Sequence, residues 1–297
     1  MDRRRFLTRV ALGVLGLGLG AGAVAAGDAV ASGFRPTFAP TFGPAGGSAG
    51  SGGPAGPTTS PRGLGHPRPE PHPMPVAQRL PPYFEPPHLT RVRLPGATLS
   101  SLPGPGNLLA LTVDDGASSE VVGAYTELCR RTGMRLTFFV TTRFASWTEN
   151  AAAMRPLVES GQLQLGNHTM SHPDLTKLST GAIQAELAGC GDFIRSTFGV
   201  DAAPYFRPPY GYLNAHVQSA ARDIGYHQPV LWYGTLSDSG RITEAQVLDF
   251  AQTWFLAQHI VIGHANYDPV THVFDQLTEL IRDRQLQPVT LNDVFSR

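Results

Sequence analysis

Apolar and polar positions alternate in a regular way from Gly106 to the C-terminus. Seven short apolar runs recur there, each with the length of a buried β-strand. These runs are Leu108–Val113, Leu136–Val140, Leu163–Gly166, Tyr205–Arg207, Pro229–Tyr233, Ile260–Gly263 and Val289–Leu291.

Longer stretches between these runs have helical patterning. Ser119–Arg131 begins at a serine cap and ends before Gly133, and Thr180–Phe198 ends before Gly199. The other predicted helices are Asn150–Ser160, Asn214–Ile224, Thr243–Leu256 and Thr271–Asp283. Strands that alternate with helices predict parallel βα units. We therefore expect an α/β fold with about seven parallel strands, either a closed or partly open (β/α) barrel or a doubly wound sheet.

The chain before Gly106 has a different composition. It holds much of the glycine and proline, because 25 of the 59 such residues (33 Gly and 26 Pro) fall within residues 31–90. A segment of this kind buries too little apolar surface to offset its chain entropy. We expect a disordered Gly/Pro/Ser-rich linker over residues 32–90 and one folded domain over residues 105–297.

Residues 1–31 have the pattern of an export signal. Arg3, Arg4 and Arg5 precede an uncharged, glycine-rich run and then small residues. The residues around Arg3 and Arg4 resemble a twin-arginine signal, which is a receptor-read address. We expect export by this route, to an extracellular or cell-wall location. The alternative is an uncleaved anchor, and only then do we expect membrane contact.

Charge and cysteine content exclude other classes. The 23 Lys and Arg residues balance 23 Asp and Glu residues, so no strong basic field is available for nucleic acid. Cys129 and Cys190 are too few for a disulfide framework, and we favour two buried thiols over a disulfide between them. No G-x-S-x-G motif occurs, which argues against a serine esterase of the α/β-hydrolase kind. We expect a monomer.

Polar side chains follow the predicted strands directly, as in a barrel enzyme whose chemistry lies on loops after the strands. The residues at these positions are Asp114, Asp115, His168, His172, Arg207, Asp238 and His264. Taken singly, each of them also fits an ordinary loop or core position.

Two histidines four residues apart can converge on one metal ion, and a strand-end aspartate can add a third ligand. Two histidines and one carboxylate leave coordination positions open, which is typical of a catalytic site. Two adjacent ionised aspartates repel each other unless a cation neutralises one and an arginine pairs with the other. Arg207, in a loop stiffened by Pro208 and Pro209, can supply that arginine.

Together these residues resemble the polysaccharide deacetylase (NodB-homology) family of metal-dependent carbohydrate esterases. The resemblance covers about residues 105–297 and includes five motifs in the family's order. The motifs are Thr112–Gly116 (T-V-D-D-G), His168–His172 (H-T-M-S-H), Arg207–Gly211 (R-P-P-Y-G), Trp232 with Asp238, and Ile260–His264. Ser239 stands where the family usually has a tryptophan, and Leu236 or Trp232 are candidates to fill its place.

The resemblance implies a distorted (β/α) barrel with a divalent metal, usually zinc, held by Asp115, His168 and His172. It implies that Asp114 is the general base toward a metal-activated water and that His264 is the general acid. Arg207 would hold Asp114, and Asp238 would pair with His264. The backbone N–H of Tyr210 would support the oxyanion, and Trp232 would line the substrate pocket.

The function implied is removal of N-acetyl groups from an N-acetylglucosamine-containing polysaccharide. Peptidoglycan is favoured over chitin because the export signal looks bacterial, and an uncharged acetylated glycan suits the neutral chain. The alternatives are an O-deacetylase of an acetylated polysaccharide and an inactive cell-wall glycan-binding protein. A glycoside hydrolase is a distant option, since it has no need of His168 and His172.

Overall fold

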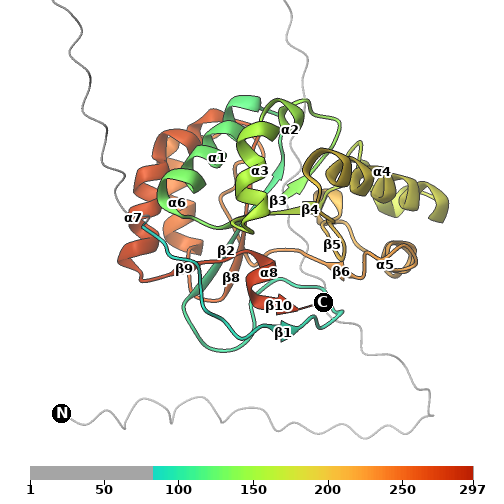
Figure 1. The fold of residues 1–297 in the computed structure, drawn as a ribbon, viewed down its shortest axis with the longest axis horizontal. Coiled ribbons are helices and arrows are strands. Elements are labelled where there is room, and N and C mark those ends of the chain that lie inside the picture. Colours follow the sequence, from blue (N-terminus) through green and yellow to red (C-terminus); the bar gives the residue numbers. More distant parts are fainter. Residues whose placement is uncertain (1–82, 297) are drawn as a thin grey trace, which may run out of the picture. The chain divides into compact units, whose positions relative to one another are not determined.

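The centre of the fold is a parallel sheet, seen in a computed structural model that describes residues 83–296 (Figure 1). Within these residues seven strands follow the order β6-β5-β4-β3-β2-β8-β7, and an eighth, β9, pairs with the start of β2. The strands are β2 (Leu108–Asp115), β3 (Leu136–Val140), β4 (Leu163–Asn167), β5 (Tyr205–Phe206), β6 (Gln228–Pro229), β7 (Gly234–Thr235), β8 (His259–His264) and β9 (Gln287–Pro288). Two short strands, β1 (Val92–Arg93) and β10 (Phe295–Ser296), pair separately.

The two edges of this sheet are joined by one short piece of chain. Strands β6 and β7 lie at opposite edges but are separated in sequence by only residues 230–233. Val230 N–H donates to Phe206 of β5, and Tyr233 N–H donates to Ile260 of β8. The sheet therefore curls into a half-barrel, which confirms the predicted distorted barrel over a doubly wound sheet.

The prediction of one strand over Pro229–Tyr233 is wrong. Leu231 N–H donates to the carbonyl of Leu99, which belongs to the segment before β2. The segment that contains Leu99 therefore lies between β6 and β7, so Val230 pairs with β5 and Tyr233 pairs with β8. The last predicted strand, Val289–Leu291, is also displaced, because Thr290 caps a short helix that begins at Leu291.

Helices cover the outside of the curled sheet, with α6 and α7 at one side of Figure 1 and α4 and α5 at the other. Their bounds are α1 (Ser119–Thr132), α2 (Ser146–Glu149), α3 (Ala151–Glu159), α4 (Thr180–Phe198), α5 (Ala215–Arg222), α6 (Glu244–Trp254), α7 (Phe274–Asp283) and α8 (Leu291–Val294). Three 3₁₀ turns are η1 (Leu175–Lys177), η2 (Pro209–Gly211) and η3 (Asp268–Val273).

The helices with clear sequence signals end where those signals predict. Gly133 and Gly199 follow α1 and α4 in the left-handed conformation, with φ of 77° and 73°. Ser118 and Ser179 accept the capping hydrogen bonds at the two N-termini. The predicted helix Asn150–Ser160 is confirmed as α3, with the short helix α2 before it, whereas the predicted helix Thr271–Asp283 divides into η3 and α7.

Two apolar clusters hold the elements together. The larger lies between the sheet and the helices and includes the buried thiols Cys129 and Cys190, which form no disulfide. The smaller joins inward-facing strand residues to Leu99 and Leu102 of the segment before β2. Burying each of these leucines contributes about 2 kcal/mol. Because Ser101 pairs with His259 at the start of β8, this segment closes the N-terminal end of the strands and leaves their carboxyl ends for the site.

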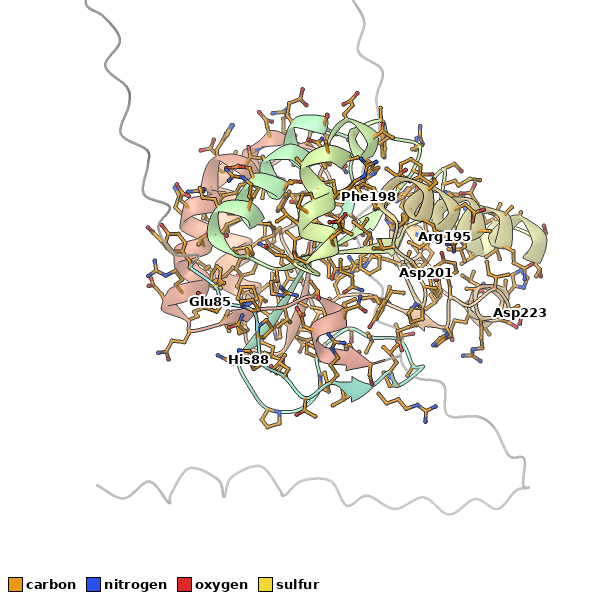
Figure 2. All side chains as sticks on the ribbon, in the orientation of Figure 1. Glu85, His88, Arg195, Phe198, Asp201 and Asp223 are labelled. Atoms are coloured by element: carbon orange, nitrogen blue, oxygen red, sulfur yellow. The ribbon has the colours of Figure 1, made fainter. Side chains whose placement is uncertain are left out.

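The segments predicted at the N-terminus lie mostly outside the described residues. The expected signal (1–31) and the linker up to residue 82 are not described, and the described residues all belong to the unit Pro73–Arg297. Glu85 and His88, labelled in Figure 2, mark the segment that follows, in which Phe84 is already buried in the core although it precedes residue 105. None of the helices within residues 83–296 has both the length and the apolar character needed to cross a bilayer.

Candidate active site

The three predicted metal ligands, Asp115, His168 and His172, converge at the carboxyl ends of β2 and β4. Asp115 Oδ1 lies 3.5 Å from His168 Nε2 and 3.3 Å from His172 Nε2. Within residues 83–296 this is the one group of three or more potential ligands that can surround a metal ion, with all three ligand atoms inside 4.8 Å of one another. His88, by contrast, is exposed and joins no such group.

The donor set fits a divalent cation. Asp115 Oδ1 is buried and accepts no hydrogen bond from the described residues, and a buried carboxylate oxygen without a partner is costly. Zinc bonds of about 2.0–2.1 Å at tetrahedral angles place neighbouring ligand atoms about 3.3 Å apart, close to the spacings here. Two imidazoles and one carboxylate also match zinc's ligand preference. These residues can therefore hold a metal.

The charges around the cluster favour the same ion. Burial opposes protonation of His168, but Asp114 and Asp115 raise its pKa, and the same two negative charges attract a cation. Burial, together with the charge of His168, lowers the pKa of His172 to about 4, so this ring is neutral at pH 7 as a ligand must be. Burial alone would raise the pKa of Asp115, but His168 outweighs it and lowers that pKa, so the carboxylate is ionised.

The orientation of His168 is set by the backbone of another motif. Its Nδ1 lies 2.6 Å from the carbonyl oxygen of Arg207, which can only accept a hydrogen bond. Nδ1 therefore carries a proton, and Nε2 is the atom that faces Asp115. Asn266, which the sequence reasoning missed, donates from its amide to Asp115 Oδ2 at 2.7 Å and so turns Oδ1 toward the histidines.

The loop between the two histidines is tightly curled. Thr169 and His172 both have left-handed backbones, with φ of 74° and 63°, a conformation that costs a non-glycine residue roughly 1–2 kcal/mol. Thr169 Oγ1 accepts from the His172 N–H, and Asn167 Oδ1 accepts from the Thr169 N–H. Glu186, on α4, accepts from the N–H groups of Met170 and Ser171 at 3.0 and 2.9 Å. The helix thus holds the loop in the shape that brings the imidazoles together.

Replacing Glu186 by alanine should weaken metal binding about 10- to 100-fold, because the loop loses the carboxylate that fixes its backbone. Competition with a chromogenic chelator measures this affinity. Glu279→Ala, which removes an exposed glutamate of α7, is the matched control and should leave the affinity unchanged. Equal affinities for the two variants would show that Glu186 plays no part in shaping the site.

Asp114 is held by a fully buried arginine. Arg207 Nη1 lies 2.5 Å from Asp114 Oδ1, while Nε and Nη2 each donate at 3.1 Å to the carbonyls of Val230 and Leu231. Those carbonyls belong to residues 230–233, which join the two edges of the sheet. The same residues therefore also position the arginine. The other oxygen, Asp114 Oδ2, lies 3.5 Å from His168 Nε2. It therefore faces the three candidate metal ligands, Asp115, His168 and His172, which are called the metal cluster below.

His264 stands beside Asp114, because the register of β2 and β8 aligns these two residues. Its Nδ1 lies 3.0 Å from Asp238 Oδ1, and its backbone N–H donates to Asp238 Oδ2. Burial opposes the charged imidazole, but the hydrogen bond and the negative charge of Asp238 raise the pKa of His264 to about 9. The ring is therefore protonated at neutral pH and can act as an acid.

Replacing Asp238 by asparagine should shift the alkaline limb of the kcat–pH profile to lower pH. The negative charge of Asp238 stabilises the protonated ring, so its loss lowers the pKa of His264, and the acid form is lost at a lower pH. Steady-state kinetics between pH 6 and 10 with one saturating substrate test this. An alkaline limb that stays in place would show that it does not report His264.

Tyr210 and Trp232 lie at the rim of this cluster. Tyr210 has a left-handed backbone, with φ of 61°, and its ring lies 4.6 Å from that of His172. The ring of Trp232 lies 5.7 Å from the Arg207 guanidinium. Ser239 is exposed, whereas Leu236 is fully buried beside β8, where a Cβ on Gly263 would meet it at 3.1 Å.

Two supporting residues had no sequence signal. Glu186 and Trp147 both lie on helices, and the indole N–H of Trp147 donates to the carbonyls of Asp115 and Thr141. Asn266 could have been predicted from the sequence, because it follows His264 by two residues and polar residues just after the strands were expected to form the site.

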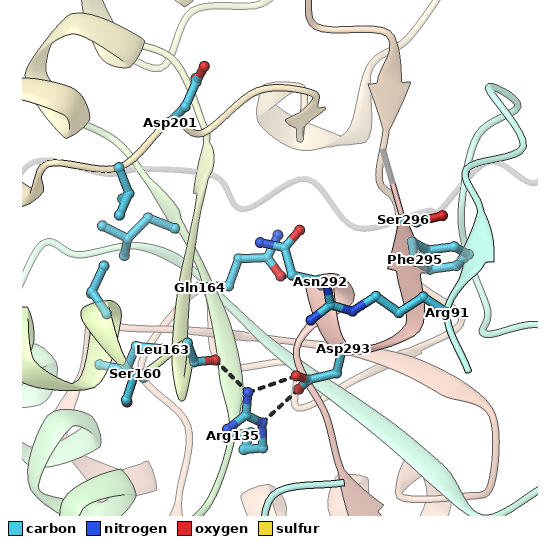
Figure 3. A pocket seen from close by; sticks show the side chains of 14 residues that line it. Arg91, Arg135, Ser160, Leu163, Gln164, Asp201, Asn292, Asp293, Phe295 and Ser296 are labelled. Carbon is cyan, nitrogen blue, oxygen red and sulfur yellow. Dashed lines mark hydrogen bonds and ion pairs between the residues drawn. The ribbon is translucent and has the colours of Figure 1, made fainter. Parts of the chain in front are cut away.

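A separate cavity in the described part of the chain lies at the other end of the strands (Figure 3). Its volume is about 500 Å³, and its wall includes the buried ion pair of Arg135 with Asp293. Arg135 also donates to the carbonyl of Gly161, where β4 is about to begin. None of the metal-cluster residues lines this cavity, so it is separate from the site.

Comparison with known proteins gives a consistent family match. Residues 102–229 match the family model described as polysaccharide deacetylase. This range includes Asp114, Asp115, His168, His172, Arg207 and Tyr210, and it ends before Trp232, Asp238 and His264.

Curated relatives match over less than half of the chain. An uncharacterized protein of Streptomyces coelicolor is 37% identical over 134 residues, which are 45% of this chain and 51% of the relative. The peptidoglycan-N-acetylglucosamine deacetylase PgdA of Listeria monocytogenes is 30% identical over 144 residues, 47% of this chain and 28% of the relative. A chitin deacetylase of Arthroderma benhamiae is 29% identical over 40% of this chain and 32% of its own length. The chain thus spans about half or less of these relatives.

Solved structures share the fold. The chitin deacetylase of Colletotrichum lindemuthianum superposes with a TM-score of 0.60 at 22% identity, over 68% of this chain and 92% of the other. A CE4 family pseudoenzyme of Bacillus anthracis superposes with the same TM-score at 19% identity, over 68% and 70% of the two chains.

Proposed function

Because this chain belongs, through residues 102–229, to the polysaccharide deacetylase family, we propose that it is a metal-dependent hydrolase that removes N-acetyl groups from an N-acetylglucosamine polysaccharide. The observation that carries the proposal is the arrangement at the strand ends: the Asp115, His168 and His172 cluster, with Asp114 on one side and His264 beside it.

Asp115, His168 and His172 would hold the metal, and zinc suits their donor atoms best. A bound ion of this kind supplies a Lewis acid that polarises the acetyl carbonyl and lowers the pKa of water toward about 7.

Asp114 is the general base. One of its oxygens is held by Arg207, and the other faces the cluster, where it accepts the proton of the attacking water. The N–H of Tyr210 donates to the oxyanion that develops on the acetyl carbonyl.

His264 is the general acid. The departing amine is a poor leaving group until it gains a proton, and the protonated imidazole beside Asp114 donates it from Nε2. Asp238 binds the opposite nitrogen, Nδ1, and therefore both orients the ring and keeps it charged.

The substrate favoured is peptidoglycan. Relatives of this chain include proteins named as peptidoglycan deacetylases and as chitin deacetylases. We favour the bacterial wall polymer because residues 1–31 resemble a twin-arginine export signal, so we also propose that the protein acts outside the cytoplasm.

A substrate panel tests the proposal. The purified chain, loaded with zinc, is incubated with peptidoglycan, N-acetylglucosamine oligomers and acetylated xylan, and released acetate is measured. Acetate from the first two supports N-deacetylation, and acetate from xylan alone would replace it with O-deacetylation. Metal-loaded protein that releases no acetate from any of them, yet binds peptidoglycan, would support a glycan-binding role without turnover.

A further inference from the structure

Two tyrosine rings are exposed side by side at the rim of the site. Tyr210 and Tyr212 have 55% and 51% of their surface open to solvent, among the most exposed large apolar residues within 83–296. Their centroids are 5.6 Å apart, and the ring planes are tilted by 41°. Two adjacent aromatic rings on the surface expose apolar area to water, and such contiguous exposed surface marks a binding site.

The turn that presents these rings is held firmly. Gly211 N–H donates to Pro208 and Tyr212 N–H to Pro209, which closes the 3₁₀ turn η2. Gly211 has a φ of 71°, and a Cβ there would lie 2.9 Å from the Trp232 ring, so the backbone packs directly on that indole. Any other residue at Gly211 would push the turn away from Trp232.

The position of the pair relates it to the reacting group. The Tyr210 ring meets the ring of His172 at 4.6 Å, and the Tyr210 hydroxyl donates to the His172 carbonyl at 3.4 Å. Tyr212 lies one ring further from the metal cluster. Within the described residues the Tyr212 ring contacts only the Tyr210 ring, and its side chain makes no hydrogen bond, so its ring face is open to a ligand.

We propose that Tyr210 and Tyr212 form a sugar-binding platform, in which Tyr212 stacks on the sugar residue next to the one that is deacetylated. The apolar C–H face of a pyranose ring covers the aromatic face of Tyr212, while the Tyr212 hydroxyl remains free to bond a sugar hydroxyl. This inference rests on the proposed deacetylase function and narrows its substrate to chains of at least two sugar residues.

The test compares a glycan chain with a small acetyl ester. For Tyr212→Ala, the ratio of kcat/KM on an N-acetylglucosamine tetramer to that on 4-nitrophenyl acetate should fall about three- to tenfold, mainly through a higher KM for the tetramer. Tyr212→Phe should keep most of the ratio, because it retains the ring. Tyr233→Ala is the matched control, since Tyr233 is 59% exposed but packs on Trp254 and His259, near the start of β8. An unchanged ratio for Tyr212→Ala would overturn the platform.

A measurement of tetramer binding tests the platform even if the protein proves not to be a deacetylase. Titration of the tetramer into the metal-loaded protein, followed by calorimetry, should give weaker affinity for Tyr212→Ala than for Tyr233→Ala. Absence of acetate release from the unsubstituted chain would reject the deacetylase but leave this comparison intact. Equal affinities for the two variants would reject the platform.

Discussion

Replacing Asp114 by asparagine should abolish acetate release while the metal stays bound. The asparagine amide has nearly the same shape but accepts no proton, and loss of a general base costs about 10²- to 10⁴-fold in kcat. The ligands Asp115, His168 and His172 are unchanged, so metal content should remain at that of the unsubstituted protein. Metal analysis and the acetate assay on the same sample measure both quantities.

The buried Arg207 makes a folding control necessary for this variant. Removing the charge of Asp114 leaves a fully buried guanidinium whose hydrogen-bond acceptors are the carbonyls of Val230 and Leu231 and one amide oxygen. Complete loss of a buried ion-pair partner costs about 3–5 kcal/mol, and the amide oxygen should reduce that cost. Normal metal content with a cooperative thermal transition shows a folded protein. Wild-type kcat in such a protein would rule out Asp114 as the base.

Replacing His168 by alanine should remove metal and activity together. His168 Nε2 is one of the three ligand atoms, and its Nδ1 binds the carbonyl of Arg207, so the substitution removes a ligand and its anchor. Metal affinity should fall by more than about 100-fold, beyond the effect of losing a supporting residue. Chelator competition and acetate release measure the two losses.

His88→Ala is the matched control for this loss, because His88 is exposed and joins no cluster. It should keep both metal and activity. Retention of the metal by His168→Ala at the affinity of the His88→Ala control would contradict the ligand assignment.

Local signals in the sequence carried the prediction of most strands and of the site. Strands β2, β3, β4 and β8 are strongly apolar runs, and all four were predicted within two residues of their ends. Because parallel strands bring their carboxyl ends to one edge, polar residues after those runs converge. The separate motifs at Asp114, His168, Arg207 and His264 therefore meet in space although they span much of the chain.

The parts that escaped prediction depend on contacts between distant segments. The chain between β6 and β7 pairs with Leu99, which is more than 100 residues away in sequence, and no local sequence pattern predicts that pairing. Glu186 acts by accepting two loop N–H groups across the space between α4 and the metal loop, which helical periodicity does not reveal.

N-deacetylation should depend on a metal ion held by Asp115, His168 and His172, and one measurement tests this dependence most directly. The protein is stripped with a chelator, reloaded with zinc, and incubated with N-acetylglucosamine oligomers while acetate and new primary amines are counted. We predict equal amounts of acetate and amine from the loaded protein, loss of both on stripping, and recovery on reloading. Acetate release that is unaffected by stripping, or metal-loaded protein that yields neither acetate nor amine, would contradict the claim.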